Sequence, residues 1–114
     1  MNTISGDILR GHLETMVLAV LERGDAHGFE ILRRLEERGC GLLKLKEGTL
    51  YPALYRLEEA GRVHAQWEDD SNRHQGPRRR VYSLTKNGRR ELALRRSGWQ
   101  DFVKVVGGIV EAPS

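Results

Sequence analysis

The stretch from residue 46 to residue 61, KEGTLYPALYRLEEAG, constrains the fold more than any other part of the sequence. Leu50, Leu54 and Leu57 recur at the spacing of one helical face, which predicts an amphipathic helix. Its other sides carry Thr49, Tyr51, Pro52, Tyr55 and Arg56. Hydrogen-bond donors, flat rings and a cation on an outer face suit a helix that lies in a DNA groove. The alternative is an ordinary surface helix with exposed aromatic residues, and the flanking sequence decides between the two.

Glycine, threonine and proline residues mark the predicted ends of this helix. Gly48 or Thr49 is predicted to be its N-cap, which places Pro52 in the first turn, where the missing N–H costs little. Gly61 is predicted to follow the last helical residue in a left-handed conformation. Two helices are predicted before it, one from Asp7 to Gly24 in the centre of the core and one from Phe29 to about Gly39.

The connections between these helices carry candidate phosphate contacts. His27 lies in the turn before the second helix, where it could donate to a phosphate, cap the helix or face the solvent. Lys44 and Lys46 alternate with leucines in a short piece that is predicted to be extended, with the lysines facing outward. Two helices, a short connection and a third helix with an exposed polar face form the arrangement of a helix-turn-helix unit.

A β-hairpin is predicted after Gly61. Val63, Ala65 and Trp67 alternate with polar residues, a long polar tip follows, and a second strand runs from Arg78 to Leu84. The tip and second strand carry Arg73, His74, Arg78, Arg79 and Arg80, which suit phosphate contact or insertion into a narrow minor groove. The alternative is an edge strand protected by its charge. Acidic residues 68–70 either pair with the arginines or lie on the far side.

The last helix is predicted to begin after Thr85 as N-cap, with a basic first part. Gly107 and Gly108 are expected to bend it or end it early. Its second part has an apolar side that is predicted to pack against a second copy of the chain, formed by Trp99, Phe102, Val103, Val106, Ile109 and Val110.

Composition narrows the class of protein. Residues 44–98 carry 13 basic and 7 acidic side chains, a net +6 within a chain of net +3, which indicates a polyanionic partner or else a solvated charged surface. The sequence has no apolar run of membrane-spanning length and no signal-peptide pattern, so we expect a cytoplasmic protein without a membrane partner. The single cysteine, Cys40, excludes an internal disulfide and is either an isolated thiol or a redox sensor.

Catalytic and metal-binding patterns are missing from the sequence. The four histidines, at positions 12, 27, 64 and 74, have no metal-ligand spacing with one another or with Cys40. The glycines do not form a phosphate-binding loop after a strand, and no nucleophile elbow occurs. We therefore predict a protein that is not an enzyme and that needs no metal and no cofactor.

Three motifs resemble the PadR family of winged-helix transcription regulators. They are GFEI at residues 28–31, EGTLYPALYRLE at residues 47–58 and RVYSLTKNG at residues 80–88. The resemblance implies a homodimeric repressor that binds a palindromic operator and is released by a small molecule. Phe29 departs from the family, which usually has tyrosine there, and so lacks a hydroxyl that could reach a phosphate. Trp99 is similar to tryptophans with which some relatives hold flat aromatic ligands, although plain interface packing explains it as well.

The sequence therefore predicts an α+β winged helix-turn-helix of three helices and a two-stranded β-wing, with a C-terminal dimerisation helix. Residues 1–85 are assigned to the DNA-binding domain and residues 86–114 to the dimerisation helix. The alternative function is a winged-helix module that binds another protein and not DNA. The predicted DNA contacts are Lys44, Lys46, Thr49, Tyr51, Pro52, Tyr55, Arg56, Arg73, His74, Arg78 and Arg79.

Overall fold

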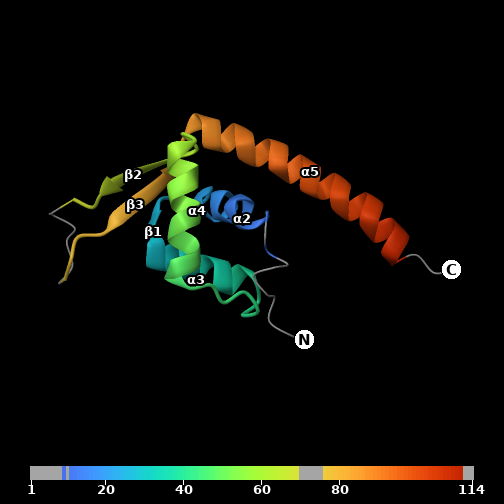
Figure 1. Cartoon of the computed structure of the whole chain (residues 1–114), viewed down its shortest axis with the longest axis horizontal. Helices are drawn as coiled ribbons and strands as arrows, with labels where there is room; N and C mark the ends of the chain where they lie inside the picture. The colour runs from blue at the N-terminus through green and yellow to red at the C-terminus, as the bar shows by residue number, and fades with distance from the viewer. Residues whose placement is uncertain (1–8, 10, 70–75, 112–114) are drawn as a thin grey trace.

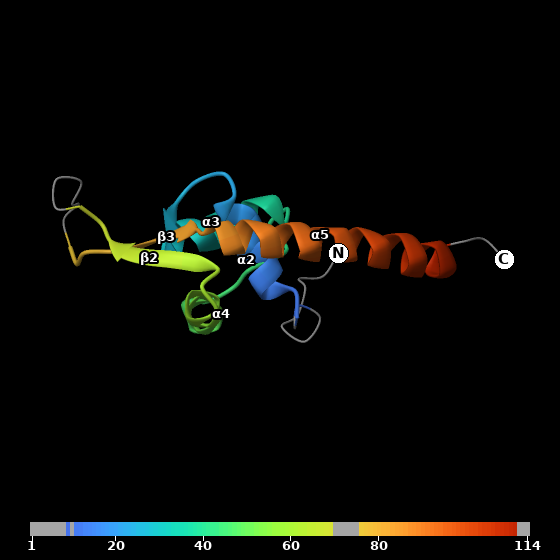
Figure 2. The same ribbon diagram turned by 90° about the horizontal axis from the view of Figure 1, so that it is seen from above.

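The computed structural model describes residues 9, 11–69 and 76–111. In chain order these form α2 (Leu13–Leu21), β1 (Ala26–His27), α3 (Gly28–Arg38), α4 (Glu47–Glu59), β2 (Val63–Trp67), β3 (Arg80–Leu84) and α5 (Lys86–Val110). We call the hairpin strands β2 and β3, with the described residues of their connection, the wing. In Figure 1 the wing projects to one side of a body formed by α2, α3 and α4, and α5 extends away on the other side. In Figure 2 the wing and α5 lie along one common direction, and α4 is seen nearly end-on to one side of them.

The strands form one antiparallel sheet in the order β1-β3-β2. The predicted hairpin is confirmed, with Val63 opposite Leu84 and Trp67 opposite Arg80, although its second strand begins at Arg80 and not at Arg78. The sequence predicts that the segment of β1 is part of a turn, whereas Ala26 pairs with Tyr82 in the structure. A strand of two residues has no alternation to recognise, and it forms here because the edge of β3 is available for pairing.

The core lies where the helices meet the sheet. The predicted inner side of α4 is confirmed, since Leu50, Leu54 and Leu57 are each at most 1% exposed. They pack with the buried residues of α2, which itself contacts α3, α4, α5 and β3. Leu92 of α5 belongs to the same core, so the first part of α5 packs on the body. The assignment of residues 86–114 to a separate dimerisation helix stays a prediction.

The first predicted helix is interrupted, and the predicted start of the third is wrong; the start predicted for the first, Asp7, lies outside the described residues. The first helix was expected from Asp7 without a break, but Gly11 has a φ of +86° and lies in a turn, and α2 begins at Leu13. That φ favours glycine and does not continue a right-handed helix. The third helix begins before the predicted N-cap, because Lys46 is the N-cap of α4. Pro52 therefore lies in the second turn, where it leaves the Gly48 carbonyl without its helical hydrogen bond.

The predictions for the other helix ends have mixed outcomes. Gly61 has the predicted left-handed conformation, with a φ of +72°. Thr85 is the N-cap of α5, and its side chain accepts a hydrogen bond from the backbone N–H of Gly88 at 2.9 Å. Gly107 and Gly108 do not end α5, which continues to Val110. The architecture is the predicted α+β winged helix-turn-helix, with β1 as a third strand of the sheet. Among the described residues, none of the helices combines the length and apolar character needed to cross a membrane.

Candidate nucleic-acid interface

The α4 helix exposes one face on the side opposite its buried leucines. Thr49, Pro52 and Tyr55 lie on this face, and Tyr55 is 63% exposed. Helical spacing places Pro52 and Tyr55 near the middle of the face. Lys44 and Lys46 are exposed just before the helix. The face therefore offers hydroxyl groups and a flat ring, with two lysines at its N-terminal end.

Arg56 lies at the edge of this face nearest to α2. Its Nε is 3.1 Å from Oε2 of Glu14, and the Arg56 side chain is 57% exposed. An ion pair this exposed contributes at most about 1 kcal/mol, so the guanidinium group can exchange the carboxylate for another acceptor at low cost. Glu14 could not be predicted as the partner of Arg56, because a residue 42 positions away gives no local signal.

Tyr51 lies at the opposite edge of the face and is 39% exposed. Burial raises the pKa of its phenol, and the nearby Glu47 carboxylate adds to the shift, so Tyr51 stays a neutral hydrogen-bond donor at physiological pH. Its ring packs against the backbone of Gly28, the first residue of α3. A Cβ atom on Gly28 would collide with the Tyr51 hydroxyl and lie 2.8 Å from its Cζ. The ring therefore needs a glycine at position 28.

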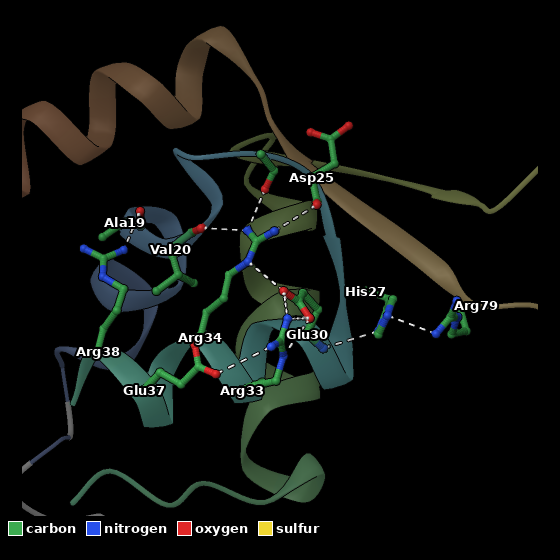
Figure 3. A network of polar contacts seen from close by, with 11 residues as sticks. Ala19, Val20, Asp25, His27, Glu30, Arg33, Arg34, Glu37, Arg38 and Arg79 are labelled. Atoms are coloured by element: carbon green, nitrogen blue, oxygen red, sulfur yellow. Dashed lines mark hydrogen bonds and ion pairs between the residues drawn. The ribbon is translucent and has the colours of Figure 1, made fainter. Parts of the chain in front are cut away.

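The wing arginines form contacts within the chain. The Nε of Arg79 is 3.3 Å from Oε2 of Glu68, whose side chain is only 9% exposed. The Nη1 of Arg79 is 3.0 Å from Nε2 of His27, and Figure 3 marks this contact between the two side chains. Arg78 donates from Nη2 to the carbonyl oxygen of Glu68 at 3.1 Å. Residues 68–70 were predicted either to pair with the wing arginines or to lie on the far side. Glu68 pairs with an arginine.

His27 connects the wing to α3. It is the N-cap of α3, and its Nδ1 accepts a hydrogen bond from the backbone N–H of Glu30 at 3.3 Å, so the capping interpretation is confirmed. A neutral imidazole has one acceptor nitrogen. His27 therefore cannot accept from both the Glu30 N–H and the Arg79 guanidinium, and its tautomer decides which of the two contacts is a full hydrogen bond.

Arg34 fixes α3 to the end of α2. Its guanidinium donates to carbonyl oxygens of the last turn of α2 and the following loop, at 2.9 Å for Val20, 2.8 Å for Gly24 and 3.3 Å for Asp25. Its Nε also donates to Oε1 of Glu30 at 3.3 Å (Figure 3). The last carbonyls of a helix have no partner inside the helix, so Arg34 satisfies acceptors that would otherwise need water.

Arg80 ties the wing to α4. Its Nη2 is 3.0 Å from Oε2 of Glu58, and its guanidinium carbon lies 5.5 Å from the centroid of the Trp67 ring. Neither contact has a local sequence signal, because Glu58 is 22 positions from Arg80 and Trp67 becomes its neighbour only when β2 pairs with β3. Tyr82 on the same strand is 5% exposed. Burial raises the pKa of its phenol, and the Arg80 guanidinium opposes that shift.

A hollow of about 480 Å³ lies between the start of α3, α4 and the wing. Aromatic side chains line it, and one of them, Phe29, is 60% exposed. The predicted contacts Arg73 and His74 lie outside the described residues. Within the part of the chain that the structure describes, no three His, Cys, Asp or Glu side chains lie close enough together to hold a metal ion.

The second half of α5 carries an uncovered apolar surface. Trp99 stacks on Phe102 with their ring centroids 5.8 Å apart, and His12 approaches Trp99 edge-on at 5.4 Å. A hollow of about 970 Å³ lies beside Trp99, between α2 and α5. The predicted dimer contacts are all exposed, by between 39% and 76%: Trp99, Phe102, Val103, Val106, Ile109 and Val110. Their role in a dimer stays a prediction.

Comparison with known proteins identifies relatives of this fold. A transcriptional regulator from Clostridium thermocellum is 31% identical, with a TM-score of 0.81 and coverage of 94% of this chain and 98% of that chain. A PadR family transcriptional regulator from Eggerthella lenta is 28% identical, with a TM-score of 0.78 and coverage of 94% and 88%. PadR of Bacillus subtilis in complex with operator DNA is 23% identical, with a TM-score of 0.63 and coverage of 73% and 45%, which shows a shared fold alone.

Similarity to a protein family identifies the chain more specifically than the shared fold does. Residues 17–94 match the PadR-like family of transcriptional regulators. This range includes α3, α4, the wing and the first part of α5, which together hold the exposed α4 face and its surroundings. The chain therefore belongs to the PadR-like family of transcriptional regulators.

Proposed function

We propose that this chain is a homodimeric repressor that binds a palindromic DNA operator and is released by a small aromatic effector. The observation that most directly supports this proposal is the exposed face of α4. Pro52 and Tyr55 project from a helix whose other side is fully buried, while Arg56 and Tyr51 stand at its two edges. A rigid helix with such a face matches the way helix-turn-helix proteins read the major groove.

The proposal assigns each predicted contact a role in the complex. The major-groove contacts are Thr49, Tyr51, Pro52, Tyr55 and Arg56. The contacts to phosphates or the minor groove are Lys44, Lys46, Arg73, His74, Arg78 and Arg79. The Bacillus subtilis PadR that was solved with operator DNA has the same fold, which supports DNA binding through this architecture.

Selection from a random duplex library tests the proposal directly. The purified full chain should enrich a palindromic sequence, and its affinity for that duplex should exceed the affinity for random duplex by about 10³-fold or more at physiological salt. Affinity should fall steeply as salt rises, because phosphate contacts release counterions. A chain that enriches no sequence and ignores salt is not a DNA-binding protein.

The dimer is proposed to form through the second half of α5. Large exposed apolar side chains along one helix favour contact with a second copy, and two-fold symmetry matches a palindromic site. A chain truncated before Trp99 should be a monomer in sedimentation experiments and should bind the operator weakly. A truncated chain that remains a dimer would place the interface elsewhere.

The effector is proposed to stack on Trp99 in the hollow between α2 and α5, where Phe102 and His12 add further rings. In a chain with Trp67→Phe, a planar aromatic ligand should quench the fluorescence of Trp99 and weaken operator binding. Quenching without any change in operator affinity would leave Trp99 as an interface residue that binds a ligand without regulation.

A protein-binding winged helix is the second candidate function. It is favoured by the pairing of Arg79 with Glu68 and of Arg80 with Glu58, which neutralises part of the positive charge of the wing. A salt titration of binding to random duplex separates the two functions. A DNA-binding wing gives measurable affinity at low salt, and a protein-binding module gives none.

A further inference from the structure

The first turn of α5 contacts the connection between α4 and the wing. We call this connection, residues 60–62, the α4–β2 turn. The hydroxyl of Thr85 donates to the carbonyl oxygen of Gly61 at 2.6 Å, and the backbone N–H of Thr85 donates to that of Arg62 at 3.2 Å. The side-chain amide of Asn87 donates to the carbonyl oxygen of Ala60 at 3.2 Å. Each residue of the turn thus has its carbonyl bonded to the start of α5.

Close packing accompanies these hydrogen bonds. Gly88 is buried, and a Cβ atom on it would collide with the carbonyl oxygen of Arg62. The Nη2 of Arg62 is also 3.6 Å from Oε1 of Glu91, one turn further along α5. No side chain separates the backbone of α5 from the α4–β2 turn at Gly88, so the two segments are held at a fixed distance.

The α4–β2 turn is itself a rigid continuation of α4. The N–H of Arg62 donates to the Leu57 carbonyl at 2.9 Å, and the N–H of Gly61 donates to the Glu58 carbonyl at 3.0 Å. These two bonds, with Gly61 in the left-handed conformation, form a Schellman motif. A force on this turn therefore acts on the whole of α4.

We propose that Thr85 and Asn87 are positioning residues that set the angle between α5 and the recognition helix α4. Through this angle they determine which distance between operator half-sites the dimer selects. The inference rests on the proposed function, in which α5 joins two copies and α4 enters the major groove. It adds a structural determinant of half-site spacing that does not itself touch DNA.

The geometry makes spacing sensitive to a small change at the α4–β2 turn. The 25 residues of α5 correspond to a length of about 37 Å. A rotation of about 5° at one end of such a rod moves the other end by about 3 Å, which is close to the rise of one base pair. Loosening this connection by a few degrees is therefore enough to make neighbouring spacings acceptable.

Asn87 allows the role to be tested without damage to the fold. Its side chain is exposed, and its removal leaves the Thr85 cap of α5 in place. Asn87→Asp is the sharper variant. It loses the amide donor to the Ala60 carbonyl but puts a negative charge in the first turn of α5, where the helix dipole favours it. A purely structural role predicts normal binding by Asn87→Asp, and a positioning role predicts a defect.

The experiment uses the duplex that the full wild-type chain selects, with one or two base pairs added or removed between its half-sites. The wild type should lose about tenfold or more in affinity on each altered spacing. Asn87→Ala, Asn87→Asp and Thr85→Val should bind the parent duplex about threefold to tenfold more weakly and discriminate between spacings less than about threefold. The slope of affinity against salt should not change, because no phosphate contact is lost.

Two controls define the outcome. Thr85→Ser keeps both hydroxyl hydrogen bonds, and Ser97→Ala changes an exposed polar residue further along α5, so both should keep the wild-type spacing profile. Wild-type spacing discrimination in both Asn87 variants overturns the inference and leaves the proposed function standing. A wild-type chain that selects no duplex overturns the proposed function, and the inference falls with it.

Discussion

The contact between Gly28 and Tyr51 predicts that the effect of one substitution on the stability of the fold depends on whether the Tyr51 ring is present. Gly28→Ala should destabilise the wild-type chain but stabilise a chain that already carries Tyr51→Ala. Gly28 is the first residue of α3 and is not among the glycines with positive φ, so its backbone accepts alanine. The nearest obstacle is the Tyr51 ring, whose hydroxyl and Cζ occupy the place of the new methyl group.

Two opposing free-energy contributions determine how much Gly28→Ala changes the stability of the folded chain. Replacing glycine by alanine at a compatible position stabilises a protein by about 0.4–1 kcal/mol, chiefly by restricting the unfolded chain. Forcing a methyl group into a packed site costs about 1–3 kcal/mol. Tyr51 is partly exposed and can rotate outward, which favours the lower part of that range. We expect a net loss of up to about 1.5 kcal/mol with Tyr51 present and a gain of about 0.5–1 kcal/mol without it.

Urea unfolding followed by circular dichroism measures the four chains of this double-mutant cycle. All four have to be compared at one protein concentration, because the stability of a dimer depends on concentration. The predicted coupling between the two positions is the strain cost alone, about 1–2 kcal/mol. Equal effects of Gly28→Ala in both backgrounds would refute the reasoning, since they would mean that the Tyr51 ring does not constrain position 28.

Three further predictions concern the interface and the sheet. Arg56→Ala should weaken operator binding by about 1–3 kcal/mol and relax specificity at one base pair, whereas equal weakening on matched and mismatched duplexes would exclude base reading. Arg79→Ala should weaken binding to all duplexes and flatten the salt slope by about one unit; an unchanged slope would mean that Arg79 contacts no phosphate. The raised pKa of the Tyr82 phenol means that the unfolded chain ionises first, so stability should hold below about pH 10 and fall above it. Urea unfolding between pH 8 and 11 should show that fall, and Tyr82→Phe should reduce it.

The features that could be predicted from sequence are those with a local signal. The spacing of the three α4 leucines marked the buried side of that helix, and Thr85 and Gly61 marked helix ends through their own conformational preferences. The start of α4 was placed two or three residues too late because Gly48 and Thr49 are both good caps, yet Lys46 takes that position. Propensity at a helix start was overridden here by the packing of the whole helix.

The features that could not be predicted depend on residues far apart in the chain. The partners of Arg56 and Arg80 are 42 and 22 positions away, and neither pair has a spacing that marks it. The strand β1 is formed by pairing with β3 and has no pattern of its own. The candidate α4 face was therefore identified from sequence, whereas the contacts that orient its edges became visible only in three dimensions.

The ion pairs change how the net positive charge of residues 44–98 is interpreted. Its net charge of +6 first indicated a polyanionic partner. Among the described residues, however, six of its arginines already pair with carboxylates, namely Arg56, Arg62, Arg79, Arg80, Arg95 and Arg96. When such an arginine exchanges its carboxylate for a phosphate, the freed carboxylate attracts a cation, so fewer ions are released overall than for an unpaired lysine. The salt slope of Arg79→Ala therefore reports whether DNA displaces Glu68. A full unit means that Arg79 binds phosphate without freeing the Glu68 carboxylate, a smaller change means that DNA displaces Glu68, and an unchanged slope means that Arg79 only holds the wing in place.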